Sequence, residues 1–348
     1  MIGVLFHGPE VFDSGWAAKI MRAFPRARFM LAGTMSRTAL HDSGLAGVES
    51  PGLLPSACVR LLEKDCSAVL LATRAKSARS GLVFGSMIAG RASPGVPLVQ
   101  AECSGLAWAA HSGVCPPRLR GALERLGLSR RRSPEAEIDV WREGGRTFRR
   151  MTTAGKGDFV LVNGIIVGKA SGGEVVFEAA GRTIKSIRGA RVKAHGLEKL
   201  ERLGGVDIAA AKLASTRALR RGGRARSVRG GGKGVVFIDH AGMHVYELAA
   251  GVEGAVTVGD DTTAVAGDIL RRFGVPVIGI VDGDGDGLHK GKLAAGSLVL
   301  TVGADDKAGL KVKKEIFGGK DRSAADFAEL RRAVAAFLAG EATGRRKY

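Results

Sequence analysis

The acidic glycine loop Asp282-Gly283-Asp284-Gly285-Asp286-Gly287 is the segment of this chain best suited to carry chemistry. Three carboxylates at alternate positions repel one another unless a cation neutralises them. The glycines between them let the loop fold so that the oxygens converge. Hard divalent cations such as Mg²⁺, and also Mn²⁺, take this kind of ligand set. We therefore expect Asp282, Asp284 and Asp286 to be metal ligands, and a tight acidic turn is the alternative interpretation.

A strand that ends in Asp-x-Asp-x-Asp-Gly resembles the Toprim fold of topoisomerases and primases. An EF-hand does not explain the loop, because its position 12 would be Leu293 and a strand precedes it. The Toprim resemblance covers roughly residues 234–303. It implies Mg²⁺ held by the aspartates for phosphoryl transfer, assisted by a glutamate at the end of an earlier strand. Asp239 stands nearest to that glutamate position and is the expected catalytic partner.

A second acidic loop, Val258-Gly259-Asp260-Asp261-Thr262-Thr263, lies where a predicted strand meets a predicted helix. Loops at the carboxyl ends of parallel strands lie near one another, so this loop should approach the first. Asp261 is most simply a helix N-cap. Asp260 is then left as a further metal ligand or catalytic group.

Two loops near the N-terminus offer groups for a small phosphorylated ligand. His7-Gly8-Pro9-Glu10 continues into Asp13-Ser14-Gly15, and Gly33-Thr34-Met35-Ser36-Arg37-Thr38 follows the second predicted strand. A glycine lets the backbone approach a ligand closely, and hydroxyls can donate hydrogen bonds to that ligand. An arginine guanidinium can bind a phosphate through two parallel hydrogen bonds. The expected ligand-binding residues are Glu10, Ser14, Gly33, Thr34, Ser36, Arg37 and Thr38. Neither a Walker motif nor G-x-G-x-x-G is present, and helix capping by Ser14 and Ser36 is the alternative.

The formal net charge of +19 is concentrated in the middle of the chain. Residues 116–233 hold 27 of the 53 Lys and Arg but 11 of the 34 Asp and Glu. Such a block is typical of a polyanion partner, nucleic acid above all, and a genomic bias toward arginine explains it equally well. Residues 216–233 are expected to form a flexible loop or to bind nucleic acid. The arginines expected to do so are Arg220, Arg221, Arg224, Arg226 and Arg229.

Hydrophobic periodicity predicts the elements that must position these groups. Short apolar runs alternate with helical patterns at both ends of the chain, which is typical of parallel sheets with crossover helices. Between them, short runs separated by turns such as Asn163-Gly164 predict a mostly antiparallel β unit. Helices are expected over 195–204 and 207–215.

The predicted fold class is α/β, with two parallel-sheet, Rossmann-like three-layer domains and a small β-rich basic segment between them. The expected divisions are an N-terminal domain at 1–115, a basic linker at 116–136, a β-rich unit at 137–215, an Arg/Gly-rich loop at 216–233, a C-terminal Toprim-like domain at 234–340 and a frayed tail at 341–348.

Composition excludes several classes of protein. No apolar run approaches the roughly 18 residues of a membrane helix, and the first residues are typical of a buried strand rather than a signal peptide. The four cysteines form no C-x-x-C pair, so reduced thiols in a cytoplasmic protein are expected rather than a zinc site. No membrane partner is expected.

Taken whole, the chain resembles an uncharacterised archaeal family found mainly in methanogens. The segments HGPEVFDSGWAAKI, GTMSRTALHDSGL, VNGIIVGKA, KAHGLEKL and GDDTTAVAGDILRRFGVPVIGIVDGDGDG carry the resemblance. It implies a cytoplasmic archaeal protein and no particular activity. The leading hypothesis is a Mg²⁺-dependent protein that acts on a nucleotide or nucleic acid, with phosphoryl transfer as its chemistry if it is an enzyme. The alternatives are a non-catalytic nucleotide- or nucleic-acid-binding regulatory protein and an assembly factor.

Overall fold

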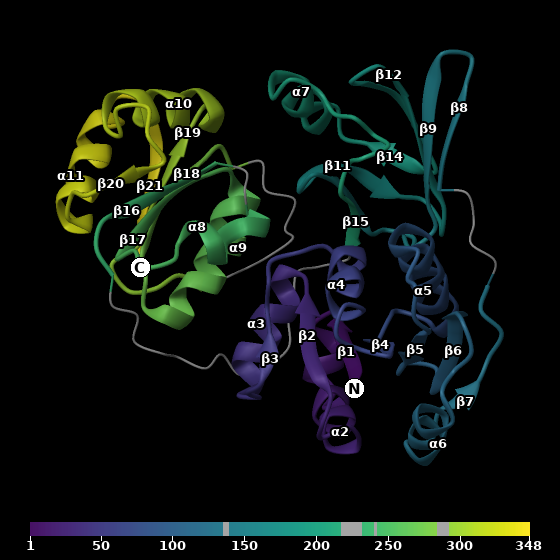
Figure 1. Ribbon diagram of the computed structural model, residues 1–348. Helices are drawn as coiled ribbons and strands as arrows, with labels where there is room; N and C mark the ends of the chain where they lie inside the picture. The colour runs from purple at the N-terminus through teal and green to yellow at the C-terminus, as the bar shows by residue number, and fades with distance from the viewer. Residues whose placement is uncertain (135–138, 217–231, 240–241, 284–291) are drawn as a thin grey trace. The chain divides into compact units, whose positions relative to one another are not determined.

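The protein is described by a computed structural model that covers residues 1–134, 139–216, 232–239, 242–283 and 292–348 (Figure 1). The chain divides into two compact units, Met1–Gly223 and Arg224–Tyr348. Each unit encloses its own buried hydrophobic clusters. Within the described residues, no helix is both long enough and apolar enough to span a membrane.

Unit 1 begins with a seven-stranded sheet in the order β3-β2-β1-β4-β5-β6-β7 (Figure 1). Its strands are β1 (Ile2–His7), β2 (Arg28–Ala32), β3 (Val48–Glu49), β4 (Ala68–Thr73), β5 (Leu98–Glu102), β6 (Ala107–Ser112) and β7 (Ser129–Arg130). The first five run parallel, and β6 is antiparallel to β5. The strand order reverses between β1 and β4, and ligands in open α/β sheets bind beside such a reversal.

Helices cover both faces of this sheet. They are α1 (Glu10–Asp13), α2 (Trp16–Ala23), α3 (Thr34–Ser43), α4 (Pro55–Leu62), α5 (Ala78–Ala92) and α6 (Pro117–Arg125). Alternate residues of a strand face opposite layers. Val4 and Phe6 accordingly pack with apolar residues of α1, α2 and α6, whereas Leu5 packs with those of α4 and α5. The prediction of a mixed α/β fold with parallel-rich sheets is confirmed.

Residues 117–130, predicted as part of a basic linker, are an integral part of this sheet domain. Helix α6 buries Leu119, Ala122 and Leu123, whose spacing of three and four places them on one helix face. Strand β7 then pairs with β6. The many arginines of the segment suggested a linker, but Arg118, Arg120 and Arg125 lie on the exposed face of α6 and Arg130 is exposed in β7.

The rest of unit 1 is a two-sheet β structure. Its strands are β8 (Val140–Glu143), β9 (Arg146–Met151), β10 (Phe159–Val162), β11 (Ile165–Ala170), β12 (Val175–Ala180), β13 (Thr183–Arg188), β14 (Ala190–Val192) and β15 (Leu213–Thr216). They form the sheets β14-β11-β10-β15 and β13-β12-β9-β8. Inward-facing side chains of both sheets make one core, with Phe177 fully buried and Leu200 of α7 (Ala194–Arg202) packed into it. The strands are antiparallel, as the sequence predicts.

The helix predicted over 207–215 is wrong. Residues 208–211 form turns and 213–216 form β15, which pairs with β10. The buried guanidinium of Arg149 donates to the carbonyl oxygens of Ile208, Ala209 and Ala211. Because these carbonyls accept hydrogen bonds from a side chain of β9, they do not need the backbone N–H partners that a helix would supply.

Unit 2 is built on a six-stranded sheet in the order β20-β16-β17-β18-β19-β21. Its strands are β16 (Val235–Asp239), β17 (Gly254–Val258), β18 (Val277–Val281), β19 (Leu298–Val302), β20 (Arg322–Ser323) and β21 (Ala342–Lys347). Strands β16 to β19 are parallel, and the two edge strands are antiparallel to their neighbours. The tail predicted to fray is therefore strand β21, which supplies backbone partners to the outer edge of β19.

Two helical layers enclose the sheet of unit 2. Its helices are η1 (Gly242–His244), α8 (Val245–Leu248), α9 (Asp260–Leu270), η2 (Arg271–Phe273), α10 (Asp305–Glu315) and α11 (Phe327–Phe337). Apolar residues of α10 and α11 pack on Val256, Ile278 and Leu300. Helix α9 packs on the sheet through Gly279, where an added Cβ would lie 2.5 Å from Thr263 Cγ2.

Gly196→Ala should destabilise unit 1, because the new Cβ would lie 1.9 Å from the backbone oxygen of Ile166. We expect a loss of about 1–3 kcal/mol, the usual cost of overpacking, measured by urea unfolding. The matched control is Gly121→Ala in α6, where the nearest atom is the end of the Arg125 side chain at 3.4 Å. That change should leave stability equal or raise it by up to about 1 kcal/mol. Equal losses in both variants would contradict the packing of α7 on β11.

Candidate functional site

Three carboxylates converge at the carboxyl edge of the unit 2 sheet. Asp260 follows β17, Asp282 follows β18, and Asp305 follows β19. Each contributes a carboxylate oxygen, and these oxygens all lie within 4.8 Å of one another. Asp305 is buried, whereas Asp260 and Asp282 are half-buried. Adjacent parallel strands thus deliver one acidic group each to a single point, which we call the carboxylate cluster.

The backbone around the carboxylate cluster is held by glycines in conformations that other residues rarely adopt. Gly259 precedes α9 at a φ of 96°, and Gly283 follows Asp282 at a φ of 83°. The Gly283 N–H donates to Asp260 Oδ2 at 3.0 Å, which ties the loop after β18 to the start of α9. Asp305 Oδ1 accepts from the N–H of Asp306 at 2.7 Å, so its carboxylate is oriented by its own helix.

Close packing beneath the cluster lets two helices begin at the same place. The hydroxyls of Thr257 and Thr263 lie 2.8 Å apart in the buried layer between β17 and α9. On the opposite face, Gly309 of α10 lies so close to Val258 that an added Cβ would be 2.6 Å from a methyl group. Both α9 and α10 therefore sit tightly on β17 and β18, and their first residues, Asp260 and Asp305, meet at the sheet edge.

The electrostatics of the cluster favour a cation. Each helix N-terminus carries a partial positive charge that stabilises a nearby carboxylate by about 0.3–1 kcal/mol. A divalent cation would neutralise the repulsion among three carboxylates more completely than the partial charges of two helix termini. Oxygen-only ligand sets of this kind suit Mg²⁺, Mn²⁺ and Ca²⁺, so the residues present fit a hard divalent cation.

The structure brings together some of the sequence-predicted acidic residues and adds one. Asp260 and Asp282 meet as predicted from their strand-end positions. Asp305 was missed, although Val302-Gly303-Ala304-Asp305-Asp306 repeats the pattern of a strand, a glycine and paired aspartates seen at Val258-Gly259-Asp260-Asp261. That similarity was the available signal.

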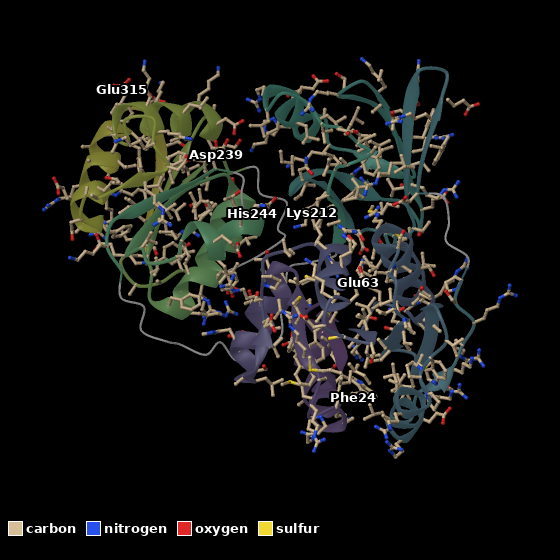
Figure 2. The ribbon with its side chains drawn as sticks, viewed as in Figure 1. Phe24, Glu63, Lys212, Asp239, His244 and Glu315 are labelled. Carbon is tan, nitrogen blue, oxygen red and sulfur yellow. The ribbon has the colours of Figure 1, made fainter. Side chains whose placement is uncertain are left out.

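The other predicted acidic residues lie apart from the cluster or outside the described residues. Asp239 ends β16 on the far side of β17 from β18, paired in register with Val258 (Figure 2). It lies at the same sheet edge but is not among the three converging carboxylates. Asp284 and Asp286 fall outside the described residues. The predicted nucleic-acid-binding arginines Arg220, Arg221, Arg224, Arg226 and Arg229 also fall outside them.

In unit 1, the loops after β1 and β2 are joined by a side chain. Ser36 Oγ accepts from the N–H of Gly8 at 2.9 Å, and Gly33 precedes α3 at a φ of 100°. The ends of two neighbouring strands are thus locked together at the edge where the strand order reverses. Thr34 and Arg37 are half-buried in the first turn of α3, beside these loops.

Two of the predicted ligand-binding hydroxyls serve helices instead. Thr38 is fully buried and donates to the Thr34 carbonyl at 3.0 Å. Ser14 donates to the Glu10 carbonyl at 2.6 Å at the end of α1. Neither Ser14 nor Ser36 caps a helix start, because Gly15 and Gly33 occupy the N-cap positions of α2 and α3.

At this edge, burial shifts the pKa values of His7 and Glu10 in opposite directions. Burial lowers the pKa of His7 to about 4, opposed by its bond to the Ala32 carbonyl and reinforced by the positive charge of Lys212. The ring stacks on Phe84 with centroids 4.7 Å apart. Burial raises the pKa of Glu10 above its usual value, while the positive side chains Arg74 and Lys76 act against the rise.

A buried carboxylate that the sequence did not single out organises the loops after β4 and β5. Glu102 is fully buried and accepts from the backbone N–H groups of Ala75, Ser104 and Gly105 at 2.7–3.0 Å. Gly81 of α5 leaves room for it, because an added Cβ would lie 2.3 Å from Glu102 Cγ. Glu102 therefore fixes the loop that carries Arg74 and Lys76. No single-residue pattern predicts this role, which depends on two loops and a helix meeting.

The fold and the cluster define an α/β protein with a carboxylate site at the ends of parallel strands, and its family can be stated. The chain belongs to the family described as "uncharacterized protein conserved in archaea" (DUF2117), whose model matches residues 4–320. It is similar to the uncharacterized protein MJ0065 of Methanocaldococcus jannaschii, at 33% identity over 335 residues covering 90% of this chain and 91% of that protein. No solved structure matches the chain. The predicted archaeal family is confirmed, and the Toprim resemblance stays a prediction.

Acidification should lower the free energy of unfolding, because the fold holds His7 in its neutral form. In the unfolded chain the group protonates near its ordinary pKa of 6.5, but in the folded chain only near 4. The unfolded state therefore binds the extra proton between these values. The free energy of unfolding should be unaffected above pH 6.5 and fall as the pH drops toward 4, by at most about 3 kcal/mol.

Urea unfolding of the wild type and of His7→Gln at pH 7 and pH 4.5 measures this effect. The glutamine amide can still donate to the Ala32 carbonyl but cannot be protonated. Its loss of stability on acidification should be smaller than that of the wild type. An equal loss would show that His7 is not held neutral by the fold.

Proposed function

We propose that this protein binds Mg²⁺ or Mn²⁺ through Asp260, Asp282 and Asp305 and acts on a phosphorylated ligand, a nucleotide or a nucleic acid. The convergence of three carboxylate oxygens within 4.8 Å of one another, from three adjacent parallel strands, carries the proposal. Asp284 and Asp286 follow Asp282 at alternate positions and extend the same ligand set. The four free, buried cysteines suit a reducing compartment and support a cytoplasmic location.

The ligand set favours a cation that retains open positions. Three carboxylates at a sheet edge leave room for water or for ligand oxygens on the solvent side, as Mg²⁺ sites that act on phosphates do. A bound cation would polarise phosphate oxygens and neutralise the charge that develops on them. Asp260 and Asp282 would hold it from half-buried positions, and Asp305 from its buried one.

Phosphoryl transfer is the chemistry we assign if the protein is an enzyme. Asp239 lies at the same sheet edge, at the end of the strand next to β17. In the Toprim resemblance this is the position nearest the assisting glutamate. Asp239 and Asp260 are therefore our candidates for the groups that act on the reacting ligand, whereas a regulatory protein would need the cation site alone.

The N-terminal sheet supplies a second place for a phosphorylated ligand. The Rossmann-like strand order reverses between β1 and β4, and ligands bind in the crevice beside such a reversal. Glu10, Thr34, Ser36 and Arg37 lie in the first turns of helices that follow β1 and β2. The positive side chains Arg74 and Lys76 act electrostatically on Glu10, which supports an anionic ligand at this edge.

Isothermal titration with Mg²⁺ and Mn²⁺ tests the cation site. Asp282→Asn and Asp305→Asn should each weaken binding by roughly tenfold or more, because each removes a charged ligand worth at least about 1.4 kcal/mol. The control is Glu315→Gln, which removes a carboxylate at the opposite end of α10 (Figure 2). It should bind like the wild type. If the wild type binds no cation at millimolar concentration, or if all three variants bind alike, the proposal fails.

A nucleic-acid-binding role is the second candidate, and the β8–β9 hairpin favours it. Trp141 and Phe148 stack across the hairpin with ring centroids 5.2 Å apart, and the Arg150 guanidinium lies 5.4 Å from the Trp141 ring. Exposed Arg142 and Arg146 flank the hairpin turn. Residues 140–193 hold eleven Lys and Arg against four Asp and Glu. Aromatic rings among basic residues are typical of single-stranded nucleic acid sites.

Fluorescence anisotropy with a single-stranded RNA oligonucleotide tests this second candidate. Trp141→Leu keeps apolar bulk but removes the indole ring, and it should weaken binding roughly tenfold if a base stacks there. Arg142→Gln should lower the slope of log affinity against log salt by about 0.7. Lys307→Gln in unit 2 removes the same charge elsewhere and should change neither. Binding that is independent of salt, or equally weakened by Lys307→Gln, would contradict this role.

A further inference from the structure

A cavity of about 420 Å³ opens in unit 1 at the C-terminal end of α5, away from the loops discussed above. Four serines and one imidazole line it, and three of these groups contact one another: Ser86 of α5, His111 of β6, and Ser133, which follows β7. The helix end itself lines the cavity through Ala89 and Gly90. Polar groups that converge on a cavity of this size mark it as a candidate site for a small molecule.

The hydrogen-bond partners around His111 fix which ring nitrogen carries the proton. Gln100 is fully buried, and its Nε2 donates to the Gly81 carbonyl at 2.9 Å, an atom that can only accept. Gln100 Oε1 must then be the acceptor that faces His111 Nε2 at 2.7 Å. His111 Nε2 therefore carries the hydrogen, and Nδ1 presents its lone pair toward the cavity.

Two serines compete for that lone pair. Ser133 Oγ lies 2.8 Å from His111 Nδ1, and Ser86 Oγ lies 3.2 Å from it. Each hydroxyl has one hydrogen to donate. Ser86 Oγ lies 2.9 Å from the Pro134 carbonyl, its shortest contact, which leaves Nδ1 to Ser133. The resulting order is Ser133 Oγ–H to His111 Nδ1, and His111 Nε2–H to Gln100 Oε1.

This is the arrangement of an activated hydroxyl. A nucleophilic serine needs a base within hydrogen-bond reach and a third group that orients the base. The neutral amide of Gln100 orients the ring but does not stabilise its charged form. Residues of the last turn of α5 line the same cavity, and the negative end of a helix dipole favours an imidazolium as it forms. Burial lowers the pKa of His111 to about 4, so the ring is neutral at neutral pH.

We propose that Ser133 is a nucleophile toward activated acyl and phosphonyl groups, with His111 as its general base and Gln100 as a positioning residue. Ser133 Oγ forms a bond to the electrophilic carbon or phosphorus, and the bond from that atom to its leaving group breaks. The Oγ proton passes to His111 Nδ1 and then to the departing group. The site lies wholly within unit 1 and does not depend on the carboxylate cluster.

Labelling with a fluorophosphonate tests the proposal, because it forms a stable Ser Oγ–P bond with loss of fluoride. Peptide mass spectrometry of the full-length protein should locate the adduct on Ser133. His111→Gln should slow labelling by roughly 100-fold, the lower range for loss of a general base. Ser133→Ala should abolish it. Ser67→Ala, which removes an exposed hydroxyl that does not line the cavity, should label within about twofold of the wild type.

Circular dichroism first establishes that each variant is folded. Absence of the adduct on Ser133 in the wild type would overturn the proposal, as would equal labelling rates in the wild type and folded His111→Gln. An adduct found mainly on Ser86 would show that Ser86, and not Ser133, is the nucleophile, and it would overturn the proposal as well.

Discussion

Like-charge repulsion at the edge of the unit 2 sheet is the constraint on which the functional account depends. Two carboxylate oxygens no more than 4.8 Å apart repel by about 3 kcal/mol or more at an effective dielectric constant of ~20. Three such pairs arise from Asp260, Asp282 and Asp305, and the N-termini of α9 and α10 and the N–H groups of Gly283 and Asp306 act against that energy. A divalent cation bound among these side chains would relieve the repulsion between them.

The scaffold makes this proximity unavoidable. Parallel strands in sequential order place the ends of β17, β18 and β19 side by side. Close contacts of Gly279 with Thr263 and of Gly309 with Val258 bring the two following helices down onto the sheet. Strand β21 closes the open edge beside β19. The packed core of unit 2 thus holds the acidic residues together at its edge.

The sequence predicted most of the parallel framework because buried strands and amphipathic helices have distinct periods. Helix 207–215 was mispredicted because Arg149, a residue distant in sequence, captures the turn carbonyls. Asp260 and Asp282 could be paired from the rule that strand-end loops share one edge. Asp305 required knowing that β19 lies next to β18. The network of Gln100, His111 and Ser133 depends on the register of β5 with β6 and on the path of the chain after β7, which local patterns do not specify.

Anomalous diffraction from crystals of the full-length protein grown with Mn²⁺ tests the central claim most directly. We expect an anomalous peak within ligand distance, about 2.0–2.3 Å, of carboxylate oxygens of Asp260, Asp282 and Asp305. The peak should be lost in crystals of Asp282→Asn/Asp305→Asn. A well-ordered cluster without a peak, or Mn²⁺ bound only elsewhere on the chain, would contradict it.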